Sequence, residues 1–189
     1  MKYFKKMVGK KCYLSPINPE DAEKYVLWLN DMEVAQYLTL AYQIISLSNE
    51  KEILEKFSRQ GDHYAIVESK SDELIGGCGL LNLDHINRIS EVGIFIGDKS
   101  CWNKGYGEEA LRLLLDYGFN ILNLNNVMLN TYSFNTRAIR CYRKIGFKEI
   151  GRRRQAKLIQ GKSYDIIYMD ILAGEFTAGS ILPPLSPPG

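Results

Sequence analysis

Two glycines mark the residues of this chain whose types and spacing could bind a phosphate. Gly105 and Gly107 lie in the run Trp102-Asn-Lys-Gly-Tyr-Gly-Glu108, directly before apolar residues at helical spacing. Glycine has no Cβ, so it permits unusual dihedrals and lets a ligand approach bare N–H groups. The free N–H groups and the positive dipole end of a helix N-terminus favour an anion. The pattern indicates a phosphate or pyrophosphate site, although a loop that only turns the chain would look the same.

Two nucleotide-binding motifs share part of this pattern. Gly105-x-Gly107-x-x-Ala110 matches the dinucleotide fingerprint, but that motif needs an acidic residue about 20 positions further on. Residues 124–130 contain no acidic residue. A P-loop needs its lysine after the last glycine, whereas Lys104 precedes both. Both motifs therefore fit less well than a third interpretation, which depends on a later segment.

That later segment is Asn135-Thr-Arg-Ala-Ile-Arg-Cys-Tyr-Arg-Lys-Ile-Gly-Phe147. Asn135 suits the N-cap of a short helix and Gly146 its C-cap. Asn135 and Tyr142 are seven residues, or two turns, apart and therefore point the same way.

Together the two segments resemble the acetyl-CoA-binding core of the GNAT N-acetyltransferase superfamily. The matching features are the Gly-x-Gly loop opening a long helix, a short strand over residues 127–132, and Asn-x-x-Ala-x-x-x-Tyr-x-x-x-Gly-Phe. Residues 88–94 and the segment Gly-Lys-Ser-Tyr-Asp at 161–165 are similar to its RimJ/RimL and spermidine acetyltransferase-like branch. The resemblance covers residues 11–172 and implies an N-acetyltransferase that uses acetyl-CoA. It does not name the acceptor amine.

The resemblance also implies which residues hold the cofactor. In the family, the strand before the loop is splayed from its neighbour, and its freed N–H groups bind the pantetheine arm and the thioester carbonyl. The cofactor-binding residues implied here are Ile94, Phe95 and Ile96 of that strand, Trp102, Asn103, Lys104, Gly105, Tyr106, Gly107 and Glu108 of the loop, Asn130 of the next strand, and Asn135, Ala138 and Arg143. Lys104 and Arg143 could help neutralise the phosphates, but solvated positions on helices explain them nearly as well. Trp102 departs from the family, where many members have Arg or Gln; backbone N–H groups should preserve cofactor binding.

Two side chains could handle protons. The resemblance implies that Tyr142 donates to the departing thiolate, since a phenol with a pKa of about 10 can protonate a thiolate whose acid has a pKa of about 8.5. A core tyrosine on an amphipathic helix is the alternative. Glu91 is our candidate for the base that removes a proton from the acceptor ammonium, and a solvated carboxylate at a strand end is the alternative. No metal is expected, because the four cysteines show no C-x-x-C spacing and only two histidines accompany them.

The elements that must position these residues indicate an α+β domain. We expect a single domain over residues 1–172, with a mixed, largely antiparallel sheet splayed at the acetyl-CoA site and flanked by about four helices. The expected strands are 11–15, 63–68, 74–83, 89–97, 127–132 and two more around Gln160-Gly161. The expected helices follow Asn18, cover 49–58, follow Gly107, and lie between Asn135 and Gly146. Trp28 lies off the buried stripe of the first helix, and we expect it to pack against a neighbour rather than cover the cleft.

Composition limits the partners. The 189 residues carry a formal net charge of +2, with 24% charged and 46% hydrophobic residues, which is typical of a soluble protein without a nucleic-acid or membrane partner. Residues 1–11 lack the apolar region of a signal peptide, and we expect a cytoplasmic protein. Four of the six prolines fall in the last seven residues, so residues 173–189 are expected to form a disordered tail. The expected acceptor is a small-molecule amine or a protein N-terminus. The chain could also form a homodimer. The alternative function is a non-catalytic acyl-CoA-binding or interaction module.

Overall fold

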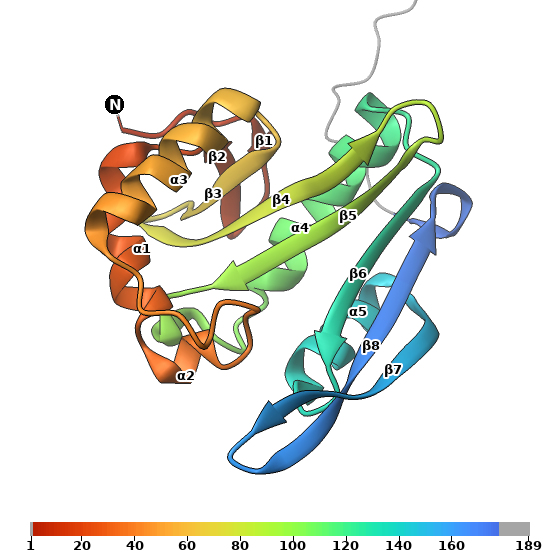
Figure 1. Cartoon of the computed structure of the whole chain (residues 1–189). Helices are drawn as coiled ribbons and strands as arrows, with labels where there is room; N and C mark the ends of the chain where they lie inside the picture. The colour runs from red at the N-terminus through yellow and green to blue at the C-terminus, as the bar shows by residue number, and fades with distance from the viewer. Residues whose placement is uncertain (1, 178–189) are drawn as a thin grey trace, which may run out of the picture.

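The computed structural model describes residues 2–177, in which eight strands form one mixed sheet of order β1-β2-β3-β4-β5-β6-β8-β7 (Figure 1). The strands are β1 (Met7–Val8), β2 (Cys12–Pro16), β3 (His63–Glu68), β4 (Leu74–Asp84), β5 (Ile89–Ile96), β6 (Asn126–Tyr132), β7 (Lys148–Ile159) and β8 (Lys162–Leu172). Only β5 and β6 pair in parallel, and the other neighbours are antiparallel. The predicted α+β fold with a mixed, largely antiparallel sheet is confirmed. The two-residue strand β1 was not predicted.

The described residues form five α-helices, one more than expected. They are α1 (Ala22–Leu29), α2 (Met32–Ala35), α3 (Leu47–Gln60), α4 (Tyr106–Asp116) and α5 (Thr136–Ile145), and α4 continues as a π-helical turn over Tyr117–Ile121. The additional helix, α2, is a single turn. The Asp31 side chain caps it by accepting a hydrogen bond from the Glu33 N–H at 2.9 Å.

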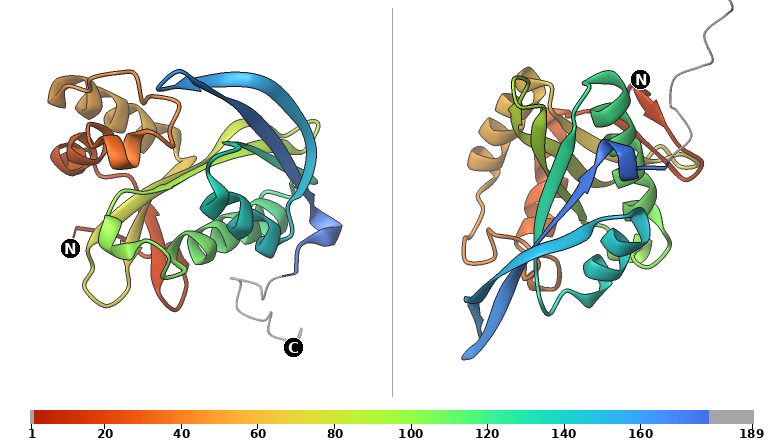
Figure 2. Two further views of the ribbon diagram at one scale, coloured as in Figure 1. Left: turned by 90° about the horizontal axis from the view of Figure 1, so that it is seen from below. Right: turned by 90° about the vertical axis from the view of Figure 1, so that its right-hand side faces the viewer.

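The helices cover both faces of the sheet, with α1, α2 and α3 on one face and α4 and α5 on the other (Figure 2). Alternation along the strands supplies both cores. Tyr13 and Val67 belong to the core under α1 and α3, whereas their neighbours Leu14 and Ile66 belong to the core under α4 and α5. Strands buried on both faces have nearly continuous apolar sequences, which is why β3 reads as a run rather than an alternation.

Trp28 packs at the end of β5, as predicted. Its ring meets Tyr25 and Phe95 edge to face, with centroids 5.7 and 6.2 Å away. A Cβ placed on Gly97 would lie 2.1 Å from the indole, so only glycine fits beneath it. A Cβ on Gly76 would lie 2.2 Å from the Phe95 carbonyl oxygen. The cluster therefore holds the end of β5 firmly against β4.

The first residues of the expected tail pack on the domain. Ala173–Glu175 form a 3-10 helix, and Glu175 is paired with Lys148. The Phe176 ring lies 5.4 Å from the Phe119 ring at the end of the α4 segment. A boundary at residue 172 thus cuts through a packed segment. The rest of that expected tail, residues 178–189, lies outside the described residues.

Candidate active site

The sheet opens between β5 and β6. The two strands pair only over Ile89–Glu91 and Asn126–Met128, after which they diverge (Figure 1). On the other side of β5, the Gly97 N–H donates to the Ile75 carbonyl of β4 at 2.9 Å. Because bonded and non-bonded residues alternate in an antiparallel pair, the N–H groups of Ile94 and Ile96 point to the opposite edge. They therefore face the gap, whereas Phe95 pairs with β4 and contributes its side chain to the Trp28 cluster.

The loop between β5 and α4 presents further N–H groups at the same end. Asn103 and Gly105 take left-handed dihedrals, with φ of 58° and 84°. Gly105 is the N-cap of α4 and makes no side-chain cap, so the N–H groups of the first turn have no acceptor within the helix. Gly107 lies inside the helix, and a Cβ there would touch only Ile96 Cγ1, at 3.6 Å. We expected both glycines to take unusual dihedrals. Only Gly105 does, because Gly107 has an ordinary helical conformation.

Lys11, which was not among the predicted residues, reaches this loop from the turn directly before β2. Its Nζ donates to the Lys104 carbonyl at 2.6 Å, and a Cβ on Gly105 would lie 3.0 Å from that Nζ. The Glu109 carboxylate positions it by accepting from the Lys11 and Cys12 N–H groups at 2.7 and 2.9 Å. The Lys104 side chain, by contrast, is exposed. Lys11 and Lys104 are 93 residues apart in the sequence, so no local sequence pattern could predict their contact.

Two loop side chains have structural partners. Glu108 forms ion pairs with Lys144 at 2.7 Å and with Arg112 at 3.3 Å, which lower the pKa of its carboxyl and join α4 to α5. The Tyr106 hydroxyl donates to Glu68, and this contact raises the pKa of Tyr106 to about 12. The N–H groups of both residues belong to the open first turn of α4. Their candidate role toward a phosphate is therefore limited to the backbone.

The helix α5 carries the second group of candidates. Asn135 is buried, and its Oδ1 accepts from the Ala138 N–H at 3.2 Å, which is the predicted N-cap. The Tyr142 ring lies 6.0 Å from Phe147, and burial raises the pKa of its phenol well above 10. No other described residue hydrogen-bonds to its hydroxyl. Arg143 is exposed and pairs with Glu149 at 3.4 Å.

Glu91 lies where the two strands part, as the last residue of β5 that pairs with β6. Its carboxylate accepts hydrogen bonds from the side-chain amides of Asn130, at 2.7 Å, and Asn82, at 3.5 Å. The structure thus brings together two candidates, Glu91 and Asn130, on opposite sides of the split.

A stack of planar groups crosses from the loop to α5. The Arg137 guanidinium carbon lies 4.1 Å from the centroid of the Trp102 ring and 5.4 Å from that of Tyr37. Trp102 also donates its indole N–H to the Ile96 carbonyl at 2.8 Å. Arg137 was not among the predicted residues. Its cation lies over Trp102, the loop residue at which the sequence departs from the resembled pattern.

The described residues contain no helix long and apolar enough to cross a membrane. Nor do residues 2–177 hold three or more His, Cys, Asp or Glu side chains grouped to hold a metal ion. The four cysteines are free thiols.

Comparison with known proteins identifies the class. The family model described as acetyltransferase (GNAT) domain matches residues 11–148. The uncharacterized N-acetyltransferase p20 of Bacillus licheniformis is 28% identical over 83% of this chain and 90% of its own length. The spermidine N(1)-acetyltransferase of Escherichia coli is 31% identical over 63% of each chain. The structure of RimL, a ribosomal alpha-N-protein acetyltransferase in complex with coenzyme A, shares the fold with a TM-score of 0.75 at 15% identity, covering 87% of this chain and 96% of that one.

The match covers the split sheet and the glycine loop that leads into α4. The chain belongs to the GNAT acetyltransferase family.

Proposed function

We propose that this protein transfers an acetyl group from acetyl-CoA to a primary amine, by direct attack within a ternary complex. The observation that carries the proposal is the convergence of two sets of N–H groups on one opening. One set is the edge of β5 at Ile94 and Ile96, and the other is the uncapped first turn of α4 after Gly105. An acyl-CoA needs both, since it has a pyrophosphate at one point and an amide-bearing arm with a thioester beyond it.

The chain's own residues fit this cosubstrate. The N–H groups of Tyr106, Gly107 and Glu108 would hold the phosphates, together with the N–H groups of Asn103 and Lys104. Residue 102 of the loop is an uncharged tryptophan, and Lys11 would supply a cation to the phosphates instead. Ile94 and Ile96 would bind the pantetheine arm, and Phe95 would fix their strand. Asn130, Asn135, Ala138 and Arg143 would line the other side of the opening.

The proposed chemistry removes two protons from the acceptor ammonium and delivers one to the departing thiolate. Glu91 removes one from the acceptor ammonium, directly or through water, and frees the nitrogen lone pair. That nitrogen forms a bond to the acetyl carbon as the carbon–sulfur bond breaks. N–H donors of β5 stabilise the negative charge on the carbonyl oxygen. Tyr142 gives its proton to the departing thiolate, and the second proton lost by the attacking nitrogen returns through water to the Tyr142 phenolate. The products are therefore an acetamide, CoA and the proton held by Glu91. Because burial raises the pKa of Tyr142, its phenol stays a donor across the range in which amines lose their protons, and we expect no loss of kcat from this group up to about pH 10.

The acceptor class is a small-molecule amine or a protein N-terminus. Proteins named for each are similar to this chain: the spermidine N(1)-acetyltransferase in sequence and RimL in fold. A non-catalytic acyl-CoA-binding module is the second candidate. It would be stabilised by CoA but would release no thiol from acetyl-CoA when an amine is added.

The experiment that tests the proposal is Tyr142→Phe. If the phenol protonates the thiolate, kcat should fall by roughly 10² to 10⁴, the range for general acid catalysis, with little change in acetyl-CoA affinity. Tyr64→Phe is the control, because Tyr64 packs in the same core as Tyr142 but its hydroxyl donates to the Gly61 carbonyl. Wild-type turnover by Tyr142→Phe, measured where chemistry limits the rate, would leave Tyr142 as a core aromatic.

A further inference from the structure

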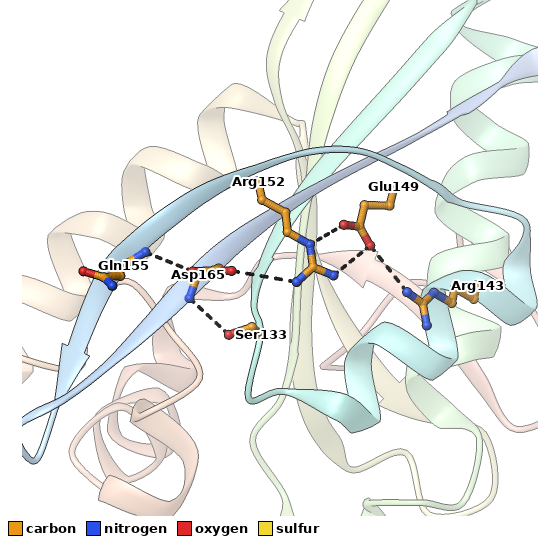
Figure 3. A network of polar contacts seen from close by, with 6 residues as sticks. All are labelled: Ser133, Arg143, Glu149, Arg152, Gln155 and Asp165. Atoms are coloured by element: carbon orange, nitrogen blue, oxygen red, sulfur yellow. Dashed lines mark hydrogen bonds and ion pairs between the residues drawn. The ribbon is translucent and has the colours of Figure 1, made fainter.

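An ordered charge network fixes the first half of β7 (Figure 3). The Arg152 guanidinium bonds both oxygens of Glu149, at 2.5 and 3.2 Å, and lies 3.8 Å from Asp165. Arg143 contacts Glu149 from α5, at 3.4 Å. Arg152 beside it lowers the pKa of Glu149 and keeps it ionised. The network therefore contains two arginines and two carboxylates, and its charges balance.

The same network builds a bulge in β7. Pairing with β8 shifts register between Arg153 and Lys157, and Gln155 in between takes a left-handed φ of 51°. Asp165 fixes that turn by accepting from the Gln155 N–H at 2.9 Å, and its own N–H donates to Ser133 Oγ at 3.1 Å. Ser133 follows β6 and lies two residues before Asn135. A bulge redirects side chains, and this one is tied to the segment that leads into α5.

The bulge leaves three cations without a carboxylate. Arg153 and Arg154 are exposed, and within residues 2–177 neither forms an ion pair. With Arg152 and Gln155 they line an open hollow. Lys157 lies over the Tyr132 ring, 4.7 Å from its centroid, and also has no acidic partner in the described chain. Because Glu149 and Asp165 are already engaged by Arg152, the bulge carries a net positive charge.

The carboxylates at the start of α2 are partly neutralised by a lysine. Asp31 and Glu33 both bind Lys99, at 2.7 and 2.6 Å, which leaves this trio one net negative charge against the three bulge cations. The β7–β8 hairpin extends beyond the other strands at the end where β5 and β6 diverge (Figure 1). An acceptor that enters the opening therefore passes the bulge cations. These cations would repel a polyamine and attract an anionic chain.

We propose that the bulge residues Arg153, Arg154 and Lys157 form a docking surface for an acidic segment of a polypeptide acceptor. The proposal rests on the proposed function and narrows its acceptor to a polypeptide whose N-terminal amine enters the opening. An acidic polypeptide fits better than a nucleic acid, since the sequence pI is 8.2 and nucleic-acid-binding domains commonly exceed about 9.

The test compares two peptides of equal length, one beginning Ala-Asp-Glu-Asp and one beginning Ala-Ser-Gly-Ser, with spermidine as a third acceptor. Arg153→Gln combined with Arg154→Gln should raise KM for the acidic peptide about five- to tenfold, the effect of two exposed charge contacts. The kcat for that peptide, its KM for acetyl-CoA and the KM for the neutral peptide should not change. Lys51→Gln with Lys56→Gln, on the exposed face of α3, is the matched control and should change none of these values.

A binding measurement separates this proposal from the proposed function. Fluorescence anisotropy of the labelled acidic peptide, with CoA present, should show weaker binding to the arginine double variant and to the wild type at high salt. Equal affinity of the wild type for both peptides, or preferred turnover of spermidine, would overturn the docking surface while leaving acetyl transfer intact. Tighter binding of a single-stranded RNA through the same arginines would also overturn it. Arginine-dependent peptide binding without acetylation of any amine would support the surface and refute the enzyme.

Discussion

Replacing each loop glycine by alanine should separate backbone strain from contact with the cosubstrate. Gly105 has a φ of 84°, a left-handed conformation that costs a residue with a Cβ about 1–2 kcal/mol. A shift of about 2–4 °C per kcal/mol is usual for 150–250 residues, so Gly105→Ala should lower Tm by about 2–8 °C. The new methyl would also lie 3.0 Å from Lys11 Nζ. Because Nζ is the end of a flexible side chain, the Lys11 ammonium should move aside and lose its hydrogen bond to the Lys104 carbonyl.

The matched control is Gly107→Ala. Gly107 lies in the first turn of α4 with an ordinary helical φ, and its added methyl would meet Ile96 Cγ1 at 3.6 Å, a normal contact. Alanine at a compatible site stabilises by about 0.4–1 kcal/mol, so Tm should be unchanged or slightly raised. The methyl lies against the strand edge that would hold the pantetheine arm, and acetyl-CoA affinity should therefore fall.

Thermal denaturation and calorimetric titration with acetyl-CoA, on both variants, measure the two effects. Gly105→Ala should lose stability and affinity together, whereas Gly107→Ala should lose affinity alone. A Gly105→Ala protein with wild-type Tm would refute the strain argument. A folded Gly107→Ala protein with wild-type affinity would refute the placement of the cosubstrate beside Ile96.

Three further predictions follow from single contacts. Lys11→Met should weaken acetyl-CoA binding about fivefold in calorimetry, the effect of one exposed charge contact, and the difference should shrink at high salt; equal salt dependence in both proteins would contradict it. Glu91→Gln should suppress the rate near neutral pH with partial recovery at high pH, where the amine is already free; an unaltered pH profile would place the base elsewhere. Truncation after Thr177 should preserve Tm, whereas truncation after Leu172 should lower Tm because it removes the contact of Phe176 with Phe119. Equal Tm values for the two truncated proteins would show that this packing contributes nothing to stability.

Local sequence patterns predicted most of the sheet and the helix caps. The strand over residues 63–68 has the predicted bounds, because its apolar run is bounded by polar turns on both sides. Asn135 caps α5 as its residue type predicts, since a short amide side chain reaches the N–H three residues on. Helix α2 was missed because one turn is too short to show a helical period.

The contacts missed at the site join distant parts of the chain. Lys11 reaches the loop only because β1 and β2 turn back against α4, where Glu109 binds the backbone of that turn. Arg137 received no role in the sequence analysis, because its position over Trp102 depends on how α5 faces the loop. The bulge in β7 depends on Asp165 in the neighbouring strand. No local pattern encodes these pairings.

The most direct test of acetyl transfer is a mass balance on wild-type protein with acetyl-CoA and a panel of amines. We predict that thiol release and acetylated amine, measured by a thiol reagent and mass spectrometry, appear in equal amounts. CoA alone at about 100 times its dissociation constant should stabilise the fold by about 2.7 kcal/mol. Stabilisation by CoA with no acetylated product from any amine would contradict the enzyme and support a non-catalytic acyl-CoA-binding module.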